Sequence, residues 1–154
     1  MGSIPDTNYP AILRMDEAVT HHTAILGVTG VGKSVFSRQL IKDIVENDTK
    51  AIIVDFTGEH KDKLQSDLAP KLIIPSGTKL ADYKSRIKSF LDSDEKAAIF
   101  EIPDMADSAG MFRAIDAFFN NIFLIAKENK ANENLQKICI VLEEAHTVVP
   151  EWNF

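Results

Sequence analysis

The sequence has little cysteine, no long hydrophobic run and no excess of positive charge. A single cysteine, Cys139, excludes an internal disulfide and is typical of a cytoplasmic protein; it lies in an apolar run, so we expect a buried thiol. The apolar runs fall short of a membrane-spanning length, so we expect no membrane partner. The net charge of -6 argues against a generally basic nucleic-acid surface, although DNA held at a few local loops remains compatible with it.

No cluster of histidine and cysteine has the spacing of zinc ligands. The composition, 45% hydrophobic and 26% charged over 154 residues, is that of a soluble globular protein with one domain and a substantial core. Residues 1–22 hold prolines and mixed polar residues and are interpreted as an extended lead-in. The main domain is predicted to begin at residue 23.

Residues 27–34 spell G-x-x-x-x-G-K-S, the phosphate-binding loop. Its glycines let the backbone curl so that several N–H groups point at one place. Lys33 would put a positive charge on the β- and γ-phosphates of ATP, and the Ser34 hydroxyl would bind Mg²⁺. The residues predicted to contact the nucleotide are Thr29, Gly30, Val31, Gly32, Lys33, Ser34 and Val35.

The residues on either side of the loop have the order that this chemistry needs. Residues 23–26 are apolar and predict a strand, and residues 33–47 predict a helix whose N-terminus adds N–H groups and its dipole to anion binding. The apolar residues of that helix recur at helical spacing, at Phe36, Leu40, Ile41 and Ile44. A chance match to the motif is therefore improbable.

Further strands and helices alternate along the chain. The predicted strands are 51–54, 72–74, 97–102 and 138–142, and the predicted helices are 61–67, 80–91 and 108–129. The longest helix has an apolar stripe at Phe112, Ile115, Phe119, Ile122 and Ala126, widened by Met111, Phe118, Phe123 and Ile125, which indicates packing on a sheet. The alternation predicts an α/β fold with a mainly parallel sheet, whose ligands bind beyond the carboxyl ends of the strands.

Two acidic residues follow the last strand, and they would complete the site. Glu143 would hold the shell of the metal, and Glu144 would orient or deprotonate the water that attacks the γ-phosphate. The alternative is a solvated strand end that carries two carboxylates. His146 either senses the γ-phosphate or is a surface histidine, and Asp55 either contacts a metal-bound water or caps the turn at 57–58.

Three segments, 22–34, 53–60 and 141–150, together resemble the HerA branch of the HerA–FtsK ATPases. The phosphate loop is specific only to P-loop NTPases, whereas D-x-x-G-E-H and E-E-A-H in this order indicate HerA. The resemblance implies a RecA-like sheet and a homo-hexamer that hydrolyses ATP and translocates double-stranded DNA, with a nuclease or a defence effector enzyme as partner. By residue match it gives Walker A roles to Lys33 and Ser34, the metal-side acid to Glu143 and the catalytic glutamate to Glu144.

The sequence departs from that family at both ends. HerA proteins carry an N-terminal β-barrel and continue past the Walker B strand, where a further strand inserts between the Walker A and Walker B strands. We therefore expect residues 23–154 to be a partial ATPase domain, incomplete at its C-terminal side, with weak activity alone. Two other functions stay open: a secretion or conjugation ATPase of the same superfamily, and a nucleotide-dependent scaffold with little turnover.

Overall fold

A single parallel sheet organises the computed structural model, which describes residues 22–28, 30–58, 64, 68–102, 107–133 and 136–148. The described strands are β1 (Lys50–Asp55), β2 (Lys71–Ile74), β3 (Ala97–Glu101) and β4 (Ile138–Leu142). Their order across the sheet is β2-β3-β1-β4, and every neighbouring pair is parallel. The predicted α/β class with a parallel sheet is confirmed, and the arrangement is consistent with a RecA-like P-loop domain.

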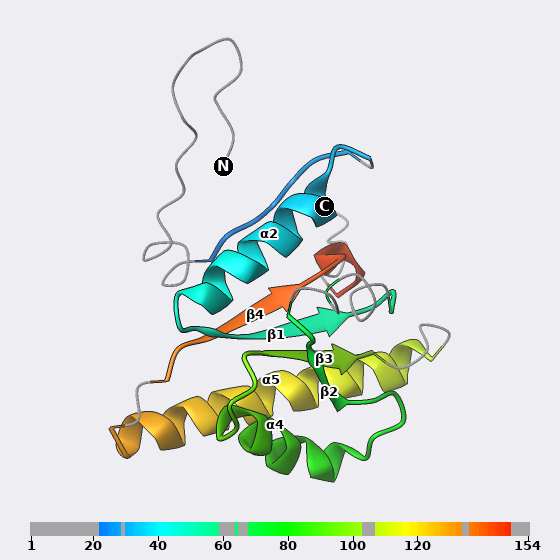
Figure 1. The fold of residues 1–154 in the computed structure, drawn as a ribbon. Helices are drawn as coiled ribbons and strands as arrows, with labels where there is room; N and C mark the ends of the chain where they lie inside the picture. The colour runs from blue at the N-terminus through cyan, green and yellow to red at the C-terminus, as the bar shows by residue number, and fades with distance from the viewer. Residues whose placement is uncertain are drawn as a thin grey trace.

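Helices cover both faces of the sheet (Figure 1). The described helices are α2 (Lys33–Glu46), α4 (Tyr83–Leu91) and α5 (Ser108–Ala131), with short 3-10 turns η1 (Leu80–Asp82) and η2 (Ala145–Thr147). Helix α2 lies on one face, and α4 and α5 lie on the other. Because consecutive parallel strands need a crossover, helices on both faces are the expected outcome of this order.

The strands are continuous apolar runs because both of their faces are buried. Every residue of β1 is buried, and its register pairs Val54 with Phe100 of β3 and with Leu142 of β4. The three strands therefore end level with one another. Asp55 and Glu101 end β1 and β3, and Glu143 directly follows β4, so all three lie at what we call the carboxyl edge of the sheet.

The larger part of the core lies between the sheet and helices α4 and α5. Phe100 of β3 stacks on Phe118 of α5 with ring centroids 4.7 Å apart, and Tyr83 of α4 meets Phe100 edge-on at 5.6 Å. Burial raises the pKa of Tyr83 above its ordinary value. A smaller cluster of Ile41, Ala51, Ile53 and Leu64 fills the space between the sheet and α2.

The strand predicted at residues 23–26 is wrong for this structure. Residues 22–28 form no strand, and the part of the sheet that the structure describes ends at β4. Leu26 is 88% exposed, so its apolar side chain gains nothing from burial. Apolar residues alone do not make a strand, since a strand needs a neighbour to accept its backbone hydrogen bonds. The expected insertion of a strand between residues 23–27 and β4 stays a prediction.

Two helices turn faces to the sheet that agree only in part with the predicted ones. In α2 the buried residues are Ser37, Ile41 and Ile44, while Phe36 is 51% exposed. In α5 the buried residues are Met111, Ala114, Ile115, Phe118 and Ile125. Phe112, Phe119 and Phe123 remain exposed. Each helix has apolar residues around more than half of its circumference, so periodicity alone does not select the packed side.

Helix α5 is also long and apolar enough to cross a membrane by length and composition, with a mean hydropathy of 1.2. Phe118 and Ile125 of this helix nevertheless lie in the core beneath the sheet. A core helix of a soluble protein passes the same test. In this structure, therefore, the contacts of α5 are those of a core helix.

Other sequence predictions differ in degree or fall outside the described residues. Helix 33–47 ends at Glu46, helix 108–129 extends to Ala131, and helix 80–91 begins as the turn η1. Cys139 is half-buried rather than buried. The lead-in at 1–21 and the helix at 61–67, apart from Leu64, lie outside the described residues.

Candidate functional site

Two glycines of the predicted phosphate loop have a left-handed backbone. Gly30 and Gly32 have φ angles of 83° and 96°, in the left-handed region that favours glycine. Gly32 is the N-cap residue of α2, so the loop leads directly into the helix. A Cβ at Gly27 would lie 2.7 Å from Cγ1 of Val31, which shows how closely the chain approaches itself across the loop. Thr29 lies outside the described residues.

The side chains that follow the loop stand at the first turn of α2. The Lys33 ammonium donates to the carbonyl of Val28, 3.2 Å away, and so reaches across the loop. Ser34 is exposed at this helix end. The N–H of Val35 donates to the carbonyl of Gly32 at 3.0 Å, in the first turn of α2, and its predicted contact with the nucleotide stays a prediction.

The end of β4 contacts the same helix. The Ser37 hydroxyl donates to Oε1 of Glu143 across 2.9 Å, and the two residues are 106 positions apart in the sequence. Along β4, Val141 packs with the α2-side cluster, while Ile138, Ile140 and Leu142 pack on the α5 side. Side chains alternate along a strand, so Glu143 lies on the side of α2. The structure therefore joins the acidic strand end to the helix of the phosphate loop.

Glu144 has a different environment. Its backbone is left-handed, with a φ of 46°, which is uncommon for a residue with a side chain. Its carboxylate lies 3.2 Å from Nδ1 of His146, and both side chains are substantially exposed. The unusual backbone turns the chain sharply after Glu143, so the two adjacent glutamates have separate surroundings. The assigned roles of Lys33, Ser34, Glu143 and Glu144 stay predictions.

Asp55 shows its turn-capping role. Its Oδ1 accepts hydrogen bonds from the N–H of Thr57 at 3.1 Å and from the N–H of Gly58 at 2.9 Å. Only 2% of Asp55 is exposed. At the next strand, Glu101 accepts from the N–H of Ser76 at 2.9 Å. Both carboxylates thus stabilise loops at the carboxyl edge.

The described residues fit a nucleotide with Mg²⁺ better than a metal ion alone. No group of three or more His, Cys, Asp or Glu side chains that could hold a metal is found among them. Mg²⁺ in nucleotide sites keeps several waters and takes its ligands from phosphates and one or two side chains, so such a group is not needed. The glycine cradle, Lys33 and Ser34 on one side and Glu143 on the other supply what this mode requires.

Ser37 was not identified from the sequence. It occupies the buried stripe of α2 with Ile41 and Ile44, at a spacing of four and seven residues. A small polar residue at a stripe position, one turn after Ser34, is the signal that could have found it. The signal is weak because serine is common at many helix positions.

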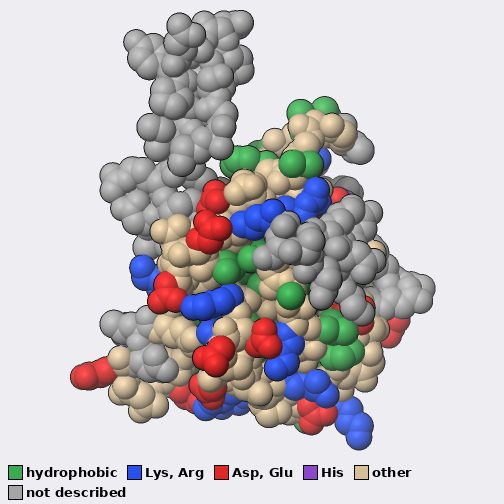
Figure 2. All heavy atoms as spheres, in the orientation of Figure 1, with side chains coloured by type: hydrophobic (Ala, Val, Ile, Leu, Met, Phe, Trp, Pro, Cys, Tyr) green, Lys and Arg blue, Asp and Glu red, His purple; other side chains and the backbone are tan. Residues whose placement is uncertain are grey.

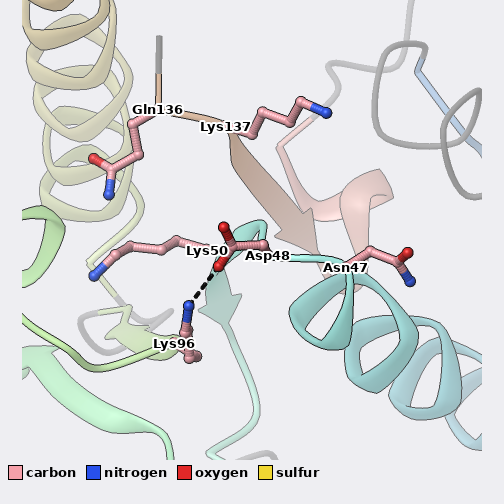
Figure 3. A pocket seen from close by; sticks show the side chains of 6 residues that line it. All are labelled: Asn47, Asp48, Lys50, Lys96, Gln136 and Lys137. Carbon is pink, nitrogen blue, oxygen red and sulfur yellow. Dashed lines mark hydrogen bonds and ion pairs between the residues drawn. The ribbon is translucent and has the colours of Figure 1, made fainter. Parts of the chain in front are cut away.

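A polar pocket of about 310 Å³ lies at the opposite end of the sheet, where the strands begin, and we call this end the amino edge (Figure 3). Lys50 enters it from β1, and its ammonium donates to the carbonyls of Phe90, Ser93 and Glu95. Burial lowers the pKa of Lys50 below its ordinary value. Lys96, also in this pocket, pairs with Asp48 at 2.7 Å. These groups already bind one another, so the pocket closes the C-terminal end of α4 rather than offering a ligand site.

Comparisons with known proteins agree with this geometry. The uncharacterized protein aq_aa31 of Aquifex aeolicus (strain VF5) is 29% identical over 68 residues, which cover 43% of this chain and 25% of that protein. No solved structure matches the chain significantly. The family described as "Helicase HerA, central domain" matches residues 1–109, a range that includes the phosphate loop and stops before Glu143. The chain therefore belongs to the HerA central-domain family, and thus to the P-loop ATPases of the HerA–FtsK superfamily.

Proposed function

We propose that this chain is the nucleotide-hydrolysing part of a hexameric motor that uses ATP and Mg²⁺ to translocate double-stranded DNA. The observation that carries the proposal is the hydrogen bond from Ser37 to Glu143. It brings the acidic end of β4 to the helix that begins at the phosphate loop. A P-loop ATPase needs this juxtaposition, because the loop holds the phosphates and the acid acts on the metal and water beside them.

Each residue has a defined task in the proposed reaction. The backbone of residues 30–34 and the Lys33 ammonium would bind the β- and γ-phosphates, and Ser34 and Glu143 would hold the hydrated Mg²⁺. When bound, the metal neutralises charge on the phosphates. Glu144 would accept a proton from the attacking water; the water oxygen bonds to the γ-phosphorus as the bond from that phosphorus to the β–γ bridging oxygen breaks, giving ADP and inorganic phosphate. The exposed Glu144 side chain is compatible with access of water.

The DNA substrate, the hexamer and a nuclease or defence effector partner are proposed from family membership. The net charge of -6 restricts DNA contact to local loops, which suits a duplex held at the centre of a ring. Figure 2 shows acidic and basic side chains interspersed on the visible face, without one continuous basic surface among the described residues. Hydrophobic side chains gather where residues 22–36 lie, and Leu26, Val28, Val31 and Val35 are exposed there.

A membrane-linked secretion or conjugation ATPase of the same superfamily is the second candidate. It is supported by superfamily membership and not by helix α5, because that helix, although long and apolar enough to cross a membrane, packs Phe118 and Ile125 in the core. A soluble motor and a membrane-linked one hydrolyse ATP with the same residues. The substrate therefore has to separate them.

The deciding experiment measures ATP hydrolysis by the full-length protein with and without duplex DNA, beside Glu144→Gln. We expect duplex DNA to stimulate hydrolysis, the stimulation to weaken with salt, and the variant to lose about a hundredfold or more of the activity. Glu95→Gln is the matched control, because it makes the same substitution at the amino edge, the end of the sheet opposite the candidate site. Stimulation by lipid vesicles instead of DNA would favour the second candidate, and nucleotide-dependent assembly unaffected by Glu144→Gln would favour a scaffold.

A further inference from the structure

We infer that Ser37 is a positioning residue for the metal-side carboxylate of Glu143, an inference that rests on the proposed function. The sequence motif ends at Ser34, and Ser37 lies one helical turn beyond it. Its hydroxyl donates to Oε1 of Glu143 at 2.9 Å. Ser37 thereby holds the carboxylate against α2, one helical turn after the predicted metal ligand Ser34.

The environment of Ser37 makes this hydrogen bond effective. Ser37 is 7% exposed and Glu143 is half-buried, so water competes weakly for either group. A hydroxyl that donates to an ionised carboxylate forms a charge-assisted hydrogen bond, which is stronger than a neutral one. A serine in a helix also has few rotamers, and its hydroxyl therefore fixes the position of the carboxylate oxygen that it contacts.

The hydrogen bond holds the Glu143 carboxylate at a point where the strand has ended. Glu143 follows the last residue of β4, and the next residue already has a left-handed backbone. The strand therefore does not continue to orient the glutamate. Ser37 supplies this orientation from a rigid helix, and partners of this kind commonly affect metal affinity by about tenfold or more although they never touch the metal.

A purely structural role predicts a different result. If Ser37 only tied α2 to β4, its loss would reduce stability and would weaken nucleotide binding equally with and without Mg²⁺. If Ser37 positions Glu143, its loss raises the Mg²⁺ concentration needed for tight binding and leaves metal-free binding unchanged. The Mg²⁺ dependence therefore distinguishes the two roles.

The experiment titrates Mg²⁺ into full-length protein with a fluorescent ATP analogue and compares Ser37→Ala, Ser37→Thr, Glu143→Ala and the double variant. We expect Ser37→Ala to raise the half-maximal Mg²⁺ concentration about tenfold and Ser37→Thr, which keeps the hydroxyl, to restore it. In the Glu143→Ala background, Ser37→Ala should cause no further shift, because Ser37 affects the Mg²⁺ dependence only through the Glu143 carboxylate, which is absent there. Ser85→Ala, which removes a hydroxyl from α4, is the control.

The outcomes separate this inference from the proposed function. A shift for Glu143→Ala without a shift for Ser37→Ala overturns the role of Ser37 and leaves the metal assignment intact. No shift for Glu143→Ala overturns the metal assignment itself. Equal weakening of binding with and without Mg²⁺ in Ser37→Ala, together with a lower melting temperature, would show a purely structural contact.

Discussion

The two faces of the sheet differ in how they are packed. On one face, helices α4 and α5 bury a cluster of aromatic and aliphatic side chains that includes Phe90, Phe100 and Phe118. On the other face, α2 covers a small aliphatic cluster, and one of its three buried residues is the polar Ser37. The phosphate loop, Glu143 and the hydrogen bond from Ser37 to Glu143 all belong to this second face, where the described residues form the smaller cluster.

The two faces therefore have different roles: the α5 face stabilises the fold, and the α2 face carries the candidate site. The free energy of burial grows with the apolar area removed from water, so the α5 face contributes most of the stability of the fold. On the α2 face, the polar Ser37 is one of the buried residues near the loop, and the apolar cluster of described residues is smaller than on the α5 face. Ligand sites are commonly found in regions of low local stability, because such regions can rearrange around a ligand.

The largest expected effect on stability is at the centre of the α5 face. Phe118 is fully buried and stacks on Phe100, so Phe118→Ala should lower the free energy of unfolding by about 3–5 kcal/mol. Phe119→Ala is the matched control, because the neighbouring ring is 39% exposed and loses far less burial. Urea denaturation followed by circular dichroism measures both. Equal losses for the two variants would show that the α5 face does not hold the core.

A smaller loss is expected at the amino edge, where the side chain of Lys50 links β1 to the end of α4. Lys50 of β1 donates to three carbonyls at the end of α4, and its ammonium lies 4.8 Å from the centroid of the Phe90 ring. Lys50→Met keeps the length of the side chain but removes every donor, and buried acceptors without partners cost about 1–3 kcal/mol. The same urea measurement should show this loss. Lys137→Met, an exposed change in the same pocket, should be nearly neutral, and a similar loss there would contradict the role of Lys50.

The sequence predicted most of the sheet, because buried parallel strands are short apolar runs with clear ends. The runs at 51–54 and 138–142 have this form, and both were found as strands. The run at 23–26 has the same form and is no strand here, because strand formation depends on a partner that local sequence does not specify. The phosphate loop could be proposed from sequence, since its chemistry constrains adjacent residues, and its role stays a prediction.

The rest of the candidate site depends on distant contacts. The hydrogen bond between Ser37 and Glu143 joins residues far apart in the sequence, and no periodic pattern encodes it. The packed sides of α2 and α5 were predicted only in part, for a related reason. Phe36 and Phe119 satisfy the helical spacing as well as the residues that are actually buried, and only the position of the sheet decides between them.

The smallest expected effect is a difference in alkylation rate between two thiols, one on each face of the sheet. Cys139 lies on the α2 side of β4, where it is half-buried and where burial raises its pKa. Because the thiolate is the reactive form, a raised pKa slows alkylation at neutral pH, and the rate should increase as the pH rises toward that pKa.

A second probe, Ala98→Cys in a Cys139→Ala background, places a thiol among the fully buried residues of the α5 face. If the α2 face opens more readily, Cys139 should react at least about tenfold faster than the thiol at position 98, as measured by mass spectrometry after timed alkylation. Equal rates would mean that both faces open together in one global unfolding event, and the thin packing of the α2 face would then carry no dynamic consequence.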